Sequence, residues 1–183
     1  MGIKVIIALL ALIVIVVIGI FNRLIRCKNL MKEGWSGIDV QLKRRHDLIP
    51  NLVETVKGYK QYEQKLLKEV TDIRSKLTKS ENPREKGKLE SGLSQALKSI
   101  FAVAEAYPEL KANQNFINLQ NTLTEIEDQI QLARRYYNGS ARDYNILVQS
   151  FPANVVAGAF NFKEGEFFEV DYATERKVPD VKF

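Results

Sequence analysis

An uninterrupted run of apolar side chains near the N-terminus constrains this chain more than any other feature of its sequence. From Val5 to Phe21 the sequence reads VIIALLALIVIVVIGIF and contains no charged residue. As a helix this run is about 25 Å long, slightly short of the ~30 Å hydrocarbon core of a bilayer. Apolar residues at 3, 24 and 25 extend it while nearby cations reach outward. Because backbone groups in lipid must bond to one another, we predict a transmembrane helix over residues 5–25.

The residues that follow the run oppose a cleaved signal peptide. Such peptides have a shorter apolar core and a small-x-small cleavage site, whereas this run ends in the bulky sequence GIFN at 19–22. A lipoprotein-type cysteine is also disfavoured, since Arg26 directly precedes Cys27. We therefore expect an uncleaved anchor.

Basic residues are distributed unevenly around this anchor. Lys4 lies in the short N-terminal segment 1–4, while Arg23, Arg26, Lys28 and Lys32 follow the apolar run. The positive-inside rule then places residues 1–4 outside the cell and the bulk of the chain in the cytoplasm. We expect these four cations to contact the headgroups of membrane lipids, at about 1 kcal/mol each.

The chain after the anchor has the 3–4 spacing of apolar residues that is typical of packed helices. A pattern of this length favours a bundle or coiled-coil seam over a lone surface helix. Glu63 interrupts it, and the turn sequence KSENPREKGK ends it. The predicted seam, for the core or for assembly, is Trp35, Ile38, Leu42, Arg45, Ile49, Leu52 and Val56, and the pattern continues through Tyr59, Leu66, Val70, Ile73 and Leu77.

Two further helices are predicted, over residues 84–107 and 112–149. Pro108 separates them, Asn113 is the expected N-cap of the second, and Asn138-Gly139 is a candidate break within it. The fold class is therefore all-α: an antiparallel bundle of three to four long helices over residues 26–152, with a C-terminal arm over 153–183.

The dense basic step at residues 43–46, KRRH, raises the question of function. Consecutive helical residues point about 100° apart, so the four cannot form one flat basic face, and acidic residues balance the cations of the body. Asp39 and Asp47 lie at helix ion-pair spacings from Lys43 and Arg44, so a self-paired solvated surface is one interpretation. We therefore predict no nucleic-acid partner.

Arg45 stands apart, because it falls on the apolar stripe, where an unpaired charge would be costly. We predict that it bonds to an acid or to backbone carbonyls near Pro50. A proline removes the hydrogen bond to the carbonyl at position 46, which an arginine or Asn51 can then occupy.

Enzyme chemistry is short of candidates. The chain has one histidine, His46, and one cysteine, so neither an internal disulfide nor a His-rich metal site is available. His46 with Asp39 or Asp47 resembles a dyad, but no nucleophile accompanies it in a known motif. We predict a protein that is not an enzyme and carries no cofactor.

The C-terminal arm is rich in phenylalanine. Phe160, Phe162, Phe167 and Phe168 exceed what a solvated tail tolerates. They either fold back on the bundle or dock on another subunit.

Several long motifs resemble the LemA family. They are WSGIDVQLKRRHDLIPNLVETVKGY, FAVAEAYPELKANQNFINLQ, ARRYYNG followed by RDYN and SFP, and the terminal Pro179, Val181 and Phe183. The resemblance covers nearly the whole chain and implies a single-pass protein of the bacterial inner membrane with a cytoplasmic helical domain. The family more often has AWSQID where this chain has GWSGID. The resemblance implies no established catalytic activity.

Two functions follow from these features. The first is a membrane-associated scaffold that forms homo-oligomers, with the seam and the arm supplying the contacts between subunits. The second is a tethered adaptor that binds and regulates another membrane protein, such as a kinase or protease.

Overall fold

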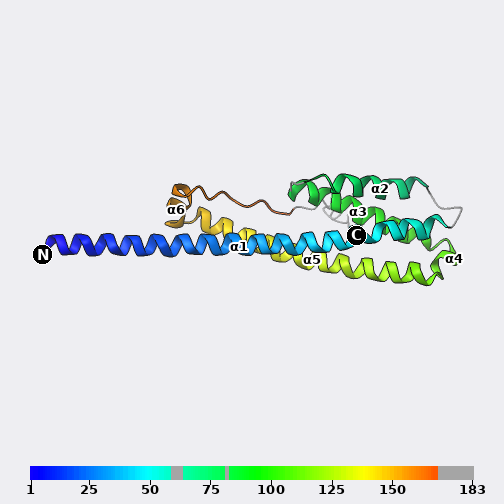
Figure 1. Cartoon of the computed structure of the whole chain (residues 1–183), viewed down its shortest axis with the longest axis horizontal. Helices are drawn as coiled ribbons and strands as arrows, with labels where there is room; N and C mark the ends of the chain where they lie inside the picture. The colour runs from blue at the N-terminus through cyan, green and yellow to red at the C-terminus, as the bar shows by residue number, and fades with distance from the viewer. Residues whose placement is uncertain (59–63, 81–82, 169–183) are drawn as a thin grey trace, which may run out of the picture. The chain divides into compact units, whose positions relative to one another are not determined.

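The computed structural model describes residues 1–58, 64–80 and 83–168, and all regular structure in these ranges is helical, so the all-α fold class is confirmed (Figure 1). Predictions for Tyr59, Glu63, Asn82 and the terminal P-x-V-x-F motif lie outside these residues. The helices are α1 (Gly2–Lys57), α2 (Gln64–Leu77), α3 (Pro83–Ala104), α4 (Pro108–Lys111), α5 (Gln114–Gln149) and α6 (Ala153–Ala159).

The long apolar stripe belongs to two helices. α1 ends at Lys57 and α2 begins at Gln64. The 3–4 spacing of apolar residues continues across this boundary, so the spacing does not show where α1 ends. Conversely, α1 continues through Pro50 and α5 continues through Asn138-Gly139, so that dipeptide does not divide the helix. Apolar spacing alone therefore does not locate helix ends.

The expected N-cap is confirmed at the start of α5. Asn113 Oδ1 accepts hydrogen bonds from the backbone N–H groups of Asn115 (2.9 Å) and Phe116 (3.1 Å). These bonds satisfy amides that have no partner within the helix. The cap fixes where α5 begins after the α4 turn.

The chain divides into two compact units, which are described separately. The first comprises Met1–Ile38 and Ala133–Phe167, and the second comprises residues 39–132 and Phe168. α1 and α5 contribute residues to both units.

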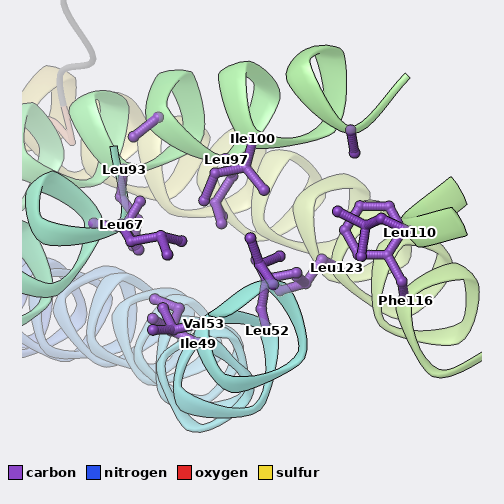
Figure 2. Close-up of a cluster of buried hydrophobic side chains, with 14 of the residues drawn as sticks. Ile49, Leu52, Val53, Leu67, Leu93, Leu97, Ile100, Leu110, Phe116 and Leu123 are labelled. Carbon is purple, nitrogen blue, oxygen red and sulfur yellow. The ribbon is translucent and has the colours of Figure 1, made fainter. Parts of the chain in front are cut away.

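The second unit is a bundle of helices that reverse direction from one to the next (Figure 1). Leu52 and Val56 of α1, Val70 of α2 and Ile100 of α3 are fully buried in it. Figure 2 shows labelled side chains of this core converging between the helices. Ridges of apolar residues from each helix therefore share one interior.

The first unit combines a small core with a long helical segment that no other part of the unit covers. The N-terminal residues of α1 extend beyond the other elements of this unit (Figure 1), and large apolar side chains there are exposed. Further along α1, Leu24 is fully buried with Tyr144 of α5 and Val156 and Ala157 of α6. α6 thus packs on α1 close to the end of the apolar run.

Candidate functional site

The most unusual buried group lies in the second unit, where Arg45 of α1 is only 1% exposed. Its Nη2 pairs with the Glu90 carboxylate of α3, whose side chain is 4% exposed. Its Nη1 donates to Glu127 of α5 at 2.5 Å and to Ser94 of α3 at 2.8 Å. One guanidinium therefore joins three helices, and of the two kinds of partner expected from the sequence, the acid is the one the structure shows.

The second carboxylate has supporting contacts of its own. The Ser94 hydroxyl donates to Glu127 at 3.0 Å, and Gln131 Nε2 donates to Glu127 at 3.3 Å. Glu127 keeps 27% of its side chain exposed, so it is better hydrated than Glu90. The buried Arg45–Glu90 pair consequently depends on protein partners far more than the Arg45–Glu127 pair does.

His46 extends this network, so two of the four basic-step residues, Arg45 and His46, belong to it. Its Nε2 lies 2.8 Å from Glu90 Oε1, and its backbone oxygen accepts a hydrogen bond from Arg74 Nε of α2 at 3.1 Å. This oxygen is the one that Pro50 leaves without its helical donor. An arginine occupies it, as expected, but one from α2.

The imidazole of His46 is neutral near pH 7. Burial lowers its pKa to about 4, and the charges of Arg45 and Arg74 act in the same direction. The adjacent Glu90 would favour the charged ring, but its charge is already matched by Arg45. A neutral ring beside a carboxylate must carry its proton on Nε2, so His46 donates to Glu90.

These contacts describe a structural network more than a reactive one. Ser94 donates to Glu127 and accepts from Arg45, so its hydroxyl is engaged away from His46. Within the residues that the structure describes, no three His, Cys, Asp or Glu side chains gather as metal ligands would. The arrangement can join four helices through charge-assisted hydrogen bonds.

The contacts that the structure shows for Asp39 and Arg44 are not the ion pairs predicted within α1, which were Asp39 with Lys43 and Arg44 with Asp47. Asp39 accepts from Lys86 of α3 at 3.3 Å, and Arg44 donates to Gln41 at 3.1 Å. The Asp39 contact links two helices, and its Lys86 side chain is only 20% exposed.

The predicted seam faces the interior of its own chain. Ile38, Leu42, Ile49, Leu52 and Val56 are at most 3% exposed, and half-buried Trp35 packs its ring on Tyr137. Of the two roles predicted for this stripe, core or assembly, the structure shows these residues in the core, where their apolar surface is used for folding.

A second constellation, which the sequence analysis missed, holds the start of the arm within the first unit. Asn145 Nδ2 donates to Gly165 O at 2.9 Å, while Asn145 Oδ1 accepts from Gly165 N at 2.7 Å. Tyr137 donates to Glu166 O at 2.6 Å and Tyr144 to Lys163 O at 2.9 Å. We call Tyr137, Tyr144 and Asn145 the arm clasp; the YYN and DYN motifs supply it, at a spacing that lies on one face of α5.

The four phenylalanines of the arm do not share one environment. Phe162 is half-buried, with its ring centroid 5.6 Å from that of Phe21, and Phe168 is 1% exposed. Phe160 and Phe167 remain 56% and 41% exposed. Phe162 and Phe168 therefore fold back on the chain, as one of the two predicted arrangements requires. Phe160 and Phe167 keep exposed surface that is available for other contacts.

The four cations predicted to face lipid lie on successive turns of α1. Arg23, Arg26 and Lys32 are exposed, while Lys28 is half-buried with its Nζ 5.5 Å from the centre of the Phe162 ring. Lys28 thus also packs on the arm, a contact that the sequence pattern did not indicate.

Comparison with known proteins identifies relatives across most of the chain. The model of the LemA family matches residues 34–183. Over 167 residues the chain is 28% identical to Protein LemA of Metamycoplasma hominis, an alignment that covers 91% of this chain and 75% of that relative.

Two further relatives are magnetosome proteins. The chain is 27% identical over 160 residues to magnetosome protein MamQ 2 of Paramagnetospirillum magneticum and 23% identical over 159 residues to magnetosome protein MamQ of Magnetospirillum gryphiswaldense. Both alignments cover 73% of this chain, but only 59% and 58% of the relatives. The chain therefore spans about six tenths of the length of these magnetosome proteins.

Proposed function

Because the chain belongs to the LemA family, we propose that it is a non-catalytic, membrane-tethered scaffold that assembles with copies of itself on the inner membrane of a bacterial cell. The relatives support this reading in one respect. Two of them are named for a cellular structure, the magnetosome, and not for a reaction.

The observation that carries the proposal is the N-terminal part of α1. Of the described residues, it alone forms a helix long and apolar enough to cross a membrane, and this segment is unburied. The same helix continues into the second unit, where it contributes Arg45 to the buried network. A tether of this kind confines copies to one plane and raises their effective concentration, so weak lateral contacts become sufficient for assembly.

Exposed apolar residues outside the anchor are the natural source of these lateral contacts, since the seam is buried. Val40 and Leu132 are both 54% exposed in the second unit. We propose that such positions, together with Phe167 of the arm, bring neighbouring copies together. The orientation with residues 1–4 outside, and the lipid contacts of Arg23, Arg26 and Lys32, are part of the same proposal.

A second candidate is an adaptor that captures another membrane protein. One observation favours it: a groove in the second unit between α1 and α2 is lined by apolar and charged groups, among them Pro50, Val53, Glu54, Lys57 and Arg74. Mixed apolar and charged grooves suit a protein segment as a ligand.

The mass distribution of the intact chain, purified in mild detergent, separates the two candidates, with negative-stain images of the same fractions. Large uniform particles that shrink in the Val40→Glu and Leu132→Glu variants support the scaffold. Arg44→Glu, a charge change at another exposed position, is the matched control and should leave particle size unchanged. Monomers or small mixed oligomers would reject the scaffold and favour the adaptor.

A further inference from the structure

The segment from 144 to 162 is the longest stretch without a charged residue after the N-terminal apolar run. Asp143 precedes it and Lys163 follows it. It contains the end of α5, the turn at Phe151-Pro152, and α6. Long uncharged stretches are unusual on a solvated surface, so the location of this one within its unit is informative.

One face of α6 packs against the end of the apolar run in α1. Val156 and Ala157 are buried with Leu24, and partly buried Val17, Ile20 and Phe21 border this cluster. The Phe21 ring centroid lies 4.9 Å from that of Phe160, in an edge-to-face arrangement. α6 is therefore attached to the very residues that the proposed anchor would hold at the membrane boundary.

Four large apolar side chains of the segment are exposed. Phe151 is 83% exposed, Val155 64%, Phe160 56% and Ile146 55%. In the same unit, most α1 residues from Val5 to Ile18, though not Val17, are exposed to a similar degree. The contact between the Phe21 and Phe160 rings links these two sets of exposed apolar residues.

Charges of both signs flank the segment in the sequence, Asp143 before it and Lys163 with Glu164 after it, whereas the exposed charges on the first turns of α1 after the apolar run are cations. Arg23 and Arg26 are exposed on the turns of α1 that follow the apolar run, and exposed Lys163 ends the uncharged segment. An apolar face edged by Lys and Arg is the pattern of elements that lie at the boundary of headgroups and acyl chains. Aromatic rings such as Phe151 and Phe160 provide large apolar area for this boundary.

We infer that residues 146–160, which include the end of α5 and the whole of α6, insert into the interfacial layer of the same bilayer that holds α1. The segment gives the chain a second membrane attachment, because it fixes the end of α5 to the lipid surface beside the anchor. This inference rests on the proposed membrane tether, and it adds a lipid-binding surface that is separate from the spanning helix.

Fluorescence quenching by brominated lipid tests the inference on the full chain. Trp35 is the one tryptophan in the sequence, so a Trp35→Phe background allows single probes to be placed. Phe151→Trp and Val155→Trp probe the inferred surface, Ile13→Trp probes the anchor, and Tyr136→Trp is the solvent control. Tyr136 packs beside Gly34, about 20 Å along α1 from Phe21. Each variant is reconstituted into phosphatidylcholine–phosphatidylglycerol vesicles with or without acyl-chain bromine, and helix content by circular dichroism verifies folding.

The inference predicts that Phe151→Trp, Val155→Trp and Ile13→Trp all lose most of their emission in brominated vesicles, while Tyr136→Trp keeps it. If Ile13→Trp is quenched and the two α6-region probes behave like Tyr136→Trp, the inference is overturned and the anchor stands. Blue-shifted but unquenched emission from those probes would mean protein contact, for example with a second copy, and would also overturn it. Unquenched Ile13→Trp would reject the membrane tether itself.

Discussion

Arg45 and Glu90 lie 45 positions apart in the sequence and form an ion pair in which neither side chain is more than 4% exposed. Removing both charges from water costs several kcal/mol, and their attraction offsets this only when other hydrogen bonds satisfy the remaining atoms. Glu127 and Ser94 supply such bonds to Arg45 Nη1, and His46 supplies one to Glu90 Oε1. The pair therefore depends on the whole arrangement of α1, α3 and α5, and each charge is stable only while the other is present.

Replacing Arg45 by Met should be strongly destabilising, because it leaves the Glu90 carboxylate buried without its main partner. Removal of one member of a buried pair costs about 3–5 kcal/mol. Chemical denaturation of the full chain in detergent micelles measures this change in the free energy of unfolding.

The adjacent arginine is the matched control for this substitution. Arg44 is exposed and donates to Gln41 within its own helix. Arg44→Met should change the free energy of unfolding by no more than about 0.5 kcal/mol. Equal effects of the two substitutions would show that the Arg45 pair contributes nothing beyond surface charge.

Several elements of this fold were predictable because their causes are local. The apolar run, the Asn113 cap and the helix break at Pro108 depend on residues a few positions apart, so the sequence displays them directly. The burial of Arg45 was predictable too, since its place on the stripe follows from helical spacing alone. Its acid was not, because the helical register between α1 and α3 is set by packing over the whole second unit.

The end of α1 and the arm clasp could not be predicted, because no local sequence pattern locates them. The stripe continues in step past Lys57, so its apolar spacing hides the end of α1. The arm clasp uses side chains of α5 to bind backbone atoms of an extended segment, and backbone partners leave no trace in residue identity. The tyrosine and asparagine content of the YYN and DYN motifs is the one available indication.

Stability should fall as the pH decreases from 6.5 toward 4 because of His46. Its pKa is about 4 in the folded chain, against 6.5 for the unperturbed group, so in this range the unfolded chain binds more protons. Protonation therefore favours unfolding: the contribution of neutral His46 is complete above 6.5 and is lost as the pH approaches 4. Arg45, Arg74 and Lys86 oppose the charged ring, while Asp47 favours it.

His46→Gln isolates this effect, because the amide can still donate toward Glu90 but does not titrate. Denaturation midpoints across the same pH range should fall less steeply in this variant than in the unmodified chain. Carboxylates titrate in both proteins, so only the difference between the two slopes is assigned to His46. Parallel slopes would mean that the imidazole is protonated equally in the folded and unfolded chains.

Asn145→Ala should release the arm at Gly165. The substitution removes both side-chain hydrogen bonds to the Gly165 backbone, each with a net value of about 1 kcal/mol. Amide exchange at Gly165 should become at least about tenfold faster, since 1.4 kcal/mol corresponds to a factor of ten. Asn154→Ala changes an exposed asparagine of α6 and should leave that exchange rate unaltered. Unchanged exchange in Asn145→Ala would show that Tyr137 and Tyr144 hold the arm without it.

Gly34 and Gly37 allow the close approach of α1 and α5 in the first unit to be tested with two similar substitutions. Both glycines lie inside α1, not at a helix start, and alanine is favoured over glycine there by about 0.5–1 kcal/mol. At Gly37 a new Cβ meets open space, so Gly37→Ala should stabilise the chain by this amount.

At Gly34 the same atom would lie 3.0 Å from Tyr137 Cα and 3.0 Å from Tyr136 Cδ1. The backbone of α5 would have to move by a few tenths of an ångström, which opposes the gain in helix propensity. Gly34→Ala should therefore raise the thermal midpoint less than Gly37→Ala, or lower it, and bulkier Gly34→Leu should lower it clearly. An equal rise for both alanine variants would show that α5 can retreat without cost, and that the contact of α1 with Tyr136 and Tyr137 is loosely packed.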